Sequence, residues 1–402
     1  MNRPIVKLFL LSSILAFSSC DCTDRNPGWV LEDTFDDPTE ENTGENNGEN
    51  NTNNQTTNNQ TTGENNGEVE TVNIVPDIPI EHALNERTAL VKGDDGTLWL
   101  AYHSCSDSEC DNVNLTLGQK RENQDWTFEN VKAQQGTFGI EIYKNQPILI
   151  FLDPTDDSFK TALRRGKDDF IFETLPVRRT DVSDGLDIAR DGDRVFVTFS
   201  NDRDPLSTFV LLEDEWRKVE TLEISDASAA YERGLQADGA GNLFLVHQDA
   251  AEWGIAKYSL RDNRWTDRQY LQQEAVRPSS MVVFDDQICI ASDVDDSYLS
   301  VSCGDMNNLE RDLWAFPNER LSSYSSLFRG DNGTLYIAFN TANNESLRLA
   351  KHSPNQEWEF KNLFEKSSYG VSTAIDSAGQ LVISYYTCEN GRCSLEVLSG
   401  RQ

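Results

Sequence analysis

A short apolar segment that recurs seven times at an even spacing constrains the fold of this chain more than any other feature. Its copies start at Leu98, Ile148, Val195, Leu243, Ile288, Leu335 and Leu381. Successive copies start 50, 47, 48, 45, 47 and 46 residues apart. So even a period indicates a structural repeat, because unrelated strands drift in spacing. Each copy is apolar at successive positions, which is typical of a strand covered on both faces by neighbouring sheets.

The residues around each apolar segment supply three more strands. A small residue introduces a strand upstream of each segment: Thr88, Gly139, Gly185, Gly234, Ser280, Ser326 and Ser372. Downstream come a third strand, a turn and an aromatic residue that opens a fourth strand: Trp126, Phe170, Trp216, Trp265, Trp314 and Trp358. Four strands per repeat, repeated radially, predict an all-β, seven-bladed β-propeller. We expect the tryptophans to pack between blades rather than to form a ligand shelf.

The seventh repeat stops at Gln402, where its outer strand would be due. Residues 69–77 form an otherwise unassigned strand before the first repeat. Pairing this strand with the seventh repeat would close the ring and remove the open sheet edges that invite aggregation. We therefore expect the propeller domain to span residues 69–402.

The N-terminus predicts export and a membrane anchor. Residues 1–19 carry Arg3 and Lys7 ahead of a short apolar run, which indicates an export signal too short to span a bilayer. The ending Ser18-Ser19-Cys20 resembles the lipobox of bacterial lipoproteins, which implies a lipidated Cys20 as the mature N-terminus. The alternative is an ordinary cleaved signal followed by a chance cysteine. Lipidation would place the protein in the bacterial cell envelope, facing the periplasm or the cell exterior.

Composition separates a tether from the folded domain and excludes one class of partner. Residues 20–68 are mostly Asn, Thr, Glu and Gly, a composition that cannot bury a core and predicts a disordered tether. The formal net charge of -33 argues against nucleic acid, because phosphate contacts need clustered Lys and Arg. We expect a monomer whose partners are the membrane, through the lipid, and a protein or glycan.

Six cysteines lie in the repeat region as close pairs: Cys105 with Cys110, Cys289 with Cys303, and Cys388 with Cys393. Even pairing in an exported chain predicts disulfides, each joining the two strands of one hairpin. A zinc site is the alternative, but the four histidines are scattered along the chain. We expect no cofactor. Acidic loops such as the one holding Asp153, Asp156 and Asp157 leave Ca²⁺ open as a ligand, with solvated carboxylates as the favoured interpretation.

The repeat, roughly D-x-x-G-x-L-x-I-A-F, a loop, L-x-L-A-K, a turn and W, is similar to repeats of bacterial propeller lipoproteins. More distantly it resembles the BNR repeats of sialidase-like propellers. The Asp-box of sialidases has a glycine that is missing before Trp358 and Trp265. The resemblance covers about residues 69–402 and implies a fold more than an activity.

Two functions fit these features. The first is a lipid-anchored binding or scaffold module without catalysis, since the sequence has no G-x-S-x-G, H-E-x-x-H or Gly-rich phosphate motif. The second is a sialidase-like glycan-processing enzyme, which needs converging arginines, a Tyr paired with a Glu, and an acid. The residues predicted to meet at the channel mouth are Glu86, Arg87, Asp184, Glu232, Arg233, Arg277 and Tyr324. Acidic and basic neighbours in this set could also merely neutralise one another.

Overall fold

The computed structural model divides the chain into two units, Met1–Asn58 and Asn59–Gln402. The residues that the structure describes all belong to the second unit: 69–79, 87–105, 113–134, 137–153, 155–178, 186–199, 207–219, 222, 228–229, 234–249, 252–271, 276–294, 298–319, 321–330, 332–341, 346–366, 368–389 and 392–400. The predicted export signal, Cys20 and the tether lie outside these residues.

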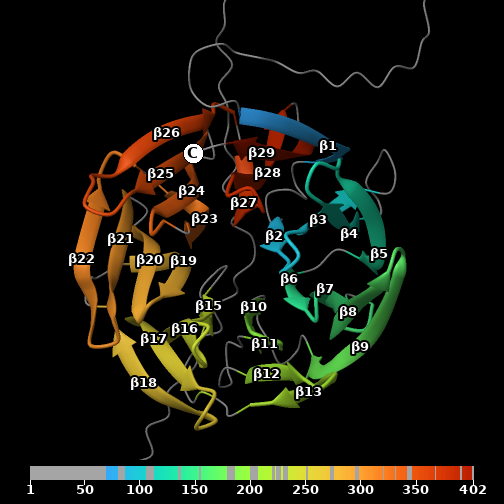
Figure 1. The fold of residues 1–402 in the computed structure, drawn as a ribbon, viewed down its shortest axis with the longest axis horizontal. Helices are drawn as coiled ribbons and strands as arrows, with labels where there is room; N and C mark the ends of the chain where they lie inside the picture. The colour runs from blue at the N-terminus through green and yellow to red at the C-terminus, as the bar shows by residue number, and fades with distance from the viewer. Residues whose placement is uncertain are drawn as a thin grey trace, which may run out of the picture. The chain divides into compact units, whose positions relative to one another are not determined.

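Seven antiparallel sheets stand in a ring, which confirms the predicted seven-bladed propeller (Figure 1). Blade 1 contains β2 (Ala89–Lys92), β3 (Leu98–Cys105), β4 (Val113–Lys120) and β5 (Thr127–Gln134). Blade 2 contains β6 (Phe138–Tyr143), β7 (Gln146–Asp153), β8 (Ser158–Gly166) and β9 (Asp169–Arg178). Blade 3 contains β10 (Leu186–Asp191), β11 (Arg194–Phe199), β12 (Ser207–Leu212) and β13 (Glu215–Lys218).

The inner strand of blade 4 is in two short pieces, β14 (Ser228–Ala229) and β15 (Leu235–Ala237), which both pair with β16 (Asn242–Asp249). Its outer strands are β17 (Glu252–Ser259) and β18 (Arg264–Tyr270). Blade 5 contains β19 (Val276–Phe284), β20 (Gln287–Val294), β21 (Tyr298–Asp305) and β22 (Asn308–Phe316). Blade 6 contains β23 (Leu321–Arg329), β24 (Leu335–Thr341), β25 (Leu347–His352) and β26 (Glu359–Phe364).

Blade 7 joins the two ends of the domain. It contains β27 (Ser368–Ile375), β28 (Leu381–Glu389) and β29 (Arg392–Gly400), and its outer strand is β1 (Val69–Pro79). β1 runs antiparallel to β29 from Val69 opposite Gly400 to Pro79 opposite Arg392. The outer position that the seventh repeat leaves empty is therefore occupied by the first strand of the domain.

The ring has two distinct ends. At the loop end, inner strands begin and second strands finish, so that the connections from one blade to the next lie there. At the turn end, tight turns join the inner strand to the second strand and the third to the fourth. In blade 6, the turn-end amide of Thr334 donates to Asn332 Oδ1 at 3.0 Å, and Gly333 has φ of +79°. Only glycine adopts that φ without strain, which explains why Gly333 directly follows Asn332 in this turn.

The core consists of apolar clusters between neighbouring blades, to which the repeat's aromatic residues contribute as predicted. Trp126 packs where blade 7 meets blade 1, and Trp265 packs where blade 3 meets blade 4. The expected position of Trp314 is wrong. Blade 5 has a tight turn at Met306–Asn307, so that β22 starts early and Trp314 lies well inside it, opposite Val301. Its ring therefore faces blade 6, with its centroid 5.9 Å from that of Trp358.

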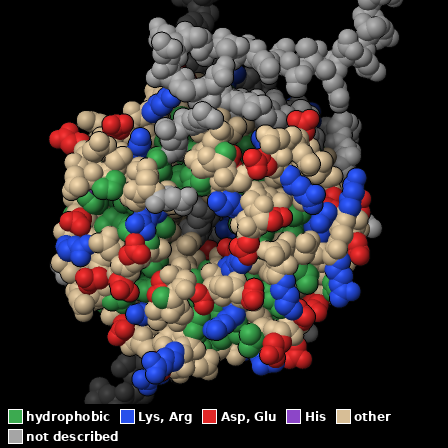
Figure 2. Space-filling model, viewed as in Figure 1, with side chains coloured by type: hydrophobic (Ala, Val, Ile, Leu, Met, Phe, Trp, Pro, Cys, Tyr) green, Lys and Arg blue, Asp and Glu red, His purple; other side chains and the backbone are tan. Residues whose placement is uncertain are grey.

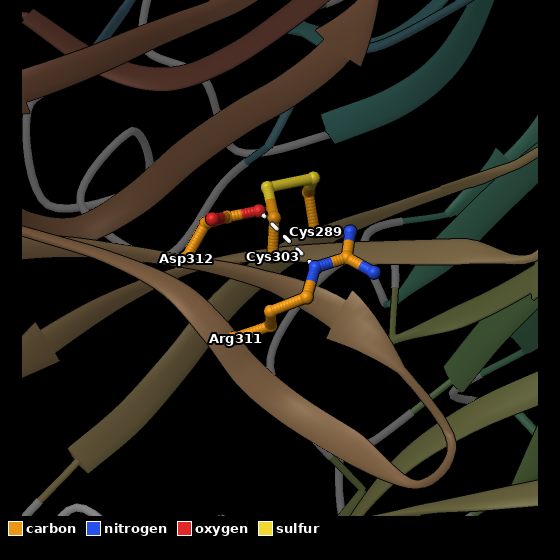
Figure 3. The surroundings of a disulfide bond; sticks show 4 residues. All are labelled: Cys289, Cys303, Arg311 and Asp312. Carbon is orange, nitrogen blue, oxygen red and sulfur yellow. Dashed lines mark hydrogen bonds and ion pairs between the residues drawn. A yellow bond between two sulfur atoms is a disulfide. The ribbon is translucent and has the colours of Figure 1, made fainter.

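Two of the predicted disulfides are present, Cys289–Cys303 and Cys388–Cys393. Each joins residues that lie directly opposite one another on paired strands. Figure 3 shows the first beside Asp312, which lies opposite Cys303 on β22. Cys105 ends β3 and is also disulfide-bonded, while its predicted partner Cys110 lies outside the described residues.

Candidate functional site

Polar residues end the second strand of the blades at the loop end of the ring, a region that we call the mouth. They occupy the sixth position of each repeated apolar segment: His103, Asp153, Ser200, Gln248, Asp293, Asn340 and Tyr386. All except Ser200 are described, and four of them are buried: His103, Asp293, Asn340 and Tyr386. The five positions before each are mostly apolar, so this change to a polar residue was visible in the sequence although our prediction of the mouth did not use it.

Arg87 is the predicted mouth residue whose placement is clearest. It precedes the inner strand of blade 1 and donates hydrogen bonds through Nη2 to the carbonyl of Phe138 in blade 2 and, at 3.3 Å, to that of Leu186 in blade 3. Its guanidinium carbon also lies 5.8 Å from the centroid of the Phe138 ring. One side chain thus ties three blades together at the mouth.

A histidine and a tyrosine flank Arg87 on the side of blade 7. The Tyr386 hydroxyl accepts a hydrogen bond from the His103 amide and donates one to the His103 carbonyl, both at 3.1 Å. The His103 imidazole packs edge-on against Phe138, with centroids 4.9 Å apart. Tyr386, His103, Phe138 and Arg87 therefore form one continuous cluster across blades 7, 1 and 2.

Burial fixes the charge state of this cluster. It lowers the pKa of the His103 imidazole to about 3, because an imidazolium there would lose its hydration. Burial likewise raises the pKa of the Tyr386 hydroxyl far above its ordinary value. Both groups are neutral at physiological pH, so they are suited to hydrogen bonding and not to proton transfer.

Blades 5 to 7 add further polar groups to the mouth. Asn340 donates from Nδ2 to the Ser368 hydroxyl at 2.6 Å, which joins blade 6 to blade 7. Arg277 lies opposite Asp293 on the paired strands β19 and β20, and directly opposed residues share one face of a sheet. Arg277 is exposed, so it presents a cation at the loop end.

The remaining predicted mouth residues cannot be placed in this way. Glu86, Asp184, Glu232 and Arg233 lie outside the described residues, and Tyr324 is described only as part of the backbone of β23. The arrangement that a sialidase-like site would need, with arginines meeting near a Tyr and a Glu, is therefore a hypothesis about residues of which only Arg87 and Arg277 have described side chains.

The calcium hypothesis receives no support from the acidic loop of blade 2. Lys160 pairs with Asp153 at 2.6 Å and with Asp156 at 3.0 Å, so one ammonium group already offsets part of the charge of these two carboxylates. Across the described ranges there is no group of three or more His, Cys, Asp or Glu side chains that could hold a metal ion. No helix in the same ranges is long and apolar enough to span a membrane.

Comparison with known proteins gives the fold alone. No protein-family model and no curated protein matches the chain. Virginiamycin B lyase from Staphylococcus aureus aligns with a TM-score of 0.52 at 11% identity, over 82% of this chain and 99% of that one. The polysaccharide lyase Uly1 aligns with a TM-score of 0.51 at 9% identity, over 79% and 90%. Trypanosoma rangeli sialidase aligns with a TM-score of 0.48 at 12% identity, over 82% of this chain and 58% of its own.

Proposed function

We propose that the chain is a lipid-anchored binding module of the bacterial cell envelope, which offers the mouth of its ring to a glycan or protein ligand. The Ser-Ser-Cys20 ending of the export signal supports the anchor. The disulfides support an oxidising compartment outside the cytoplasm, where such bonds persist. The anchor and the ligand belong to this proposal and can be tested separately.

One observation favours binding over catalysis at the mouth. The two titratable groups buried beside Arg87, His103 and Tyr386, are both held in their neutral forms. Arg87 itself already donates to two backbone carbonyls. His103 and Tyr386 are buried, so the groups that this end of the ring offers to a ligand are the exposed Arg277 and the partly exposed Arg87, which suit hydroxyls and carboxylates without moving protons.

Arg277 gives the sharper test of the ligand site, because it is exposed whereas Arg87 also holds blades together. The purified protein is screened for binding to a glycan panel, and the best ligand is titrated against Arg277→Ala. Loss of one charge-assisted hydrogen bond should weaken binding about tenfold or more. Arg264→Ala, an exposed arginine at the turn end of blade 4, is the matched control and should leave the affinity unchanged.

The anchor and the enzyme alternative have their own tests. Metabolic labelling with a clickable fatty acid should mark the wild-type protein and not Cys20→Ala, and label that persists in the variant refutes the lipidation site. Release of the fluorophore from a fluorogenic sialoside, with loss of that release in Tyr324→Phe, would establish the enzyme and overturn the binding module. We expect no turnover.

A further inference from the structure

The interface between blades 5 and 6 carries an unusual number of aromatic rings. Among the described residues, the apolar cluster at each of the other blade interfaces has one partly buried aromatic ring packed against it. The cluster between blades 5 and 6 has four beside its outer strands: Trp314, Phe316, Trp358 and Phe360. The early start of β22 is one cause, because it places Trp314 and Phe316 on the face that meets blade 6. Figure 2 shows hydrophobic side chains at the surface on the left-hand side of the molecule, where blades 5 and 6 lie.

These four rings contact one another in a continuous row. Ring centroids are 5.0 Å apart for Phe360 and Phe316, 5.6 Å for Phe316 and Trp358, and 5.9 Å for Trp358 and Trp314. The three contacts are edge to face, and such a contact leaves both faces of one ring uncovered by its partner. His352, at the end of β25, lies 5.0 Å from both tryptophans. All five side chains are partly exposed, so this set, which we call the aromatic row, is a surface as well as packing.

A paired arginine and glutamate lie at the phenylalanine end of the aromatic row. The Arg348 guanidinium carbon is 5.7 Å from the centroid of the Phe360 ring, and Nη1 donates to the Glu319 carboxylate. Glu319 is held in place by its own backbone, since its amide donates to the Phe316 carbonyl at 2.8 Å and its carbonyl accepts from Leu299 at 2.6 Å. The side chains of Arg348 and Glu319 are 22% and 11% exposed, so both reach the surface while their positions are fixed.

A sugar in its pyranose form matches both parts of this surface. Its C–H groups make an apolar face that packs flat on aromatic rings, while the hydroxyls around its rim need donors and acceptors. Arg348 supplies donors and Glu319 supplies an acceptor, and such charged partners make the stronger hydrogen bonds. Their charges balance, which favours a neutral ligand over an anion. Several rings in line suit a chain of sugars better than a single one.

We propose that the aromatic row, with Arg348 and Glu319 at one end, binds a neutral oligosaccharide of β-linked pyranoses with equatorial hydroxyls. In such a chain the hydroxyls lie close to the plane of each sugar, so both faces are free to stack, and the chain is extended like the row. The aromatic row lies beside outer strands, whereas the mouth is at the ends of second strands. The row is therefore a second site, which does not depend on the ligand of the mouth.

Titration calorimetry of the purified protein with cellohexaose, a β-linked glucose chain, tests the ligand class. We expect saturable binding, and a change in tryptophan fluorescence because the row contains Trp314 and Trp358. Maltohexaose, whose α-linkages curve the chain away from a straight path, should bind about tenfold more weakly or less well still. Absence of saturable cellohexaose binding to the folded protein would overturn the proposal.

Variants locate the site. Trp314→Ala should weaken cellohexaose binding about tenfold or more, because a truncated indole loses its stacking surface. Trp265→Ala, which removes the partly buried ring between blades 3 and 4, is the matched control and should change the affinity less than about twofold. Thermal unfolding checks that each variant is folded. If Trp314→Ala does not fold, Trp314→Phe keeps a ring in place and should weaken binding about threefold.

The polar pair and the mouth have separate variants. Replacing both Arg348 and Glu319 by methionine keeps the bulk of the two side chains and leaves no unpaired charge, so the fold should persist while cellohexaose binding falls about tenfold. Arg277→Ala at the mouth should leave it unchanged. Loss of cellohexaose binding in Arg277→Ala with full binding in Trp314→Ala would assign the sugar to the mouth and refute the second site. Equal losses in Trp314→Ala and Trp265→Ala would refute it as well.

Discussion

Acidification should weaken the fold through one buried histidine. The ordinary pKa of a histidine is 6.5, and burial lowers that of His103 to about 3. Below pH 6.5 the unfolded chain therefore binds a proton that the folded chain does not, so stability is full above that pH and is lost progressively as the pH falls toward 3. When the pH falls from about 7 to about 5, roughly 1.5 pH units of that fall lie below the ordinary pKa of histidine. They lower the free energy of unfolding by about 2 kcal/mol at this one site.

Urea unfolding at the two pH values measures this cost. The wild-type protein is compared with His103→Gln, which cannot titrate, so that the contributions of all other groups cancel in the difference. His103→Gln loses the packing on Phe138 at both pH values, so its lower stability alone is not the test. The test is how much the difference in unfolding free energy between the two proteins changes with pH. That difference should shrink by about 2 kcal/mol on acidification.

His352 supplies the control for this experiment. Burial lowers its pKa as well, but the side chain is half-buried and stacks on Trp358, with ring centroids 5.0 Å apart. His352→Gln should therefore change the pH dependence less than His103→Gln does. An equal loss of stability in the wild type and His103→Gln, or an NMR titration of His103 near the ordinary value, would refute the reasoning.

Three further predictions concern the ring. Removal of residues 1–79 takes away β1 and exposes β29, so thermal unfolding should lose its single cooperative transition; an unchanged transition would show that β1 is dispensable. A Cβ at Gly139 would lie 2.9 Å from both Ile188 Cγ2 and Leu186 Cδ2, so Gly139→Ala should lower the free energy of unfolding in urea by about 1–3 kcal/mol. At Gly166 the atom nearest to an added Cβ is 3.9 Å away. Gly166→Ala, the control, should therefore stay within about 1 kcal/mol of wild type. Replacing both Cys388 and Cys393 by serine should cost about 2 kcal/mol, because the loop they close is short, and an unchanged denaturation midpoint would contradict this.

The repeat period was sufficient to predict the ring. Seven apolar segments at nearly equal spacing leave few alternatives, because each must be covered on both faces and each is followed by the same turn chemistry. Hairpin geometry also predicted Cys289 opposite Cys303, since both lie on paired strands of one blade. The predicted position of Trp314 was wrong because the residue was assigned to the start of the fourth strand only for being aromatic. The length of the preceding turn determines which face of the strand it occupies.

Contacts between blades were not predictable from the sequence in the same way. The pair of Glu129 and Arg164 joins the outer strand of one blade to the third strand of the next, and no spacing rule relates residues in successive repeats. The mouth was partly predictable. Arg87 was identified from its place before an inner strand, but its bonds to Phe138 and Leu186 depend on how blades 2 and 3 approach the axis.

The inner strands are joined in two ways, and the difference bears on where a ligand would be recognised. Around blades 5, 6, 7 and 1, hydroxyl groups link neighbouring inner strands: Ser279 bonds Ser325 at 2.6 Å, Ser326 bonds Thr373 at 2.6 Å, and the Thr88 hydroxyl donates to the Gly370 carbonyl at 2.7 Å. Between blades 2 and 3 the corresponding contact is apolar, with Gly139 against Ile188.

Hydrogen bonds fix direction as well as distance, whereas apolar contact does not. The hydroxyl-linked side of the ring therefore holds its strands in one relative orientation. The polar groups Asn340, Tyr386 and His103 lie on that side, in blades 6, 7 and 1, and Arg87 extends from blade 1 over the apolar side. A recognition site needs side chains held in place by their surroundings. Asn340, Tyr386 and His103 are themselves buried, so their role is to hold the strands in place, and we expect exposed groups of the loop end such as Arg277 to contact a ligand.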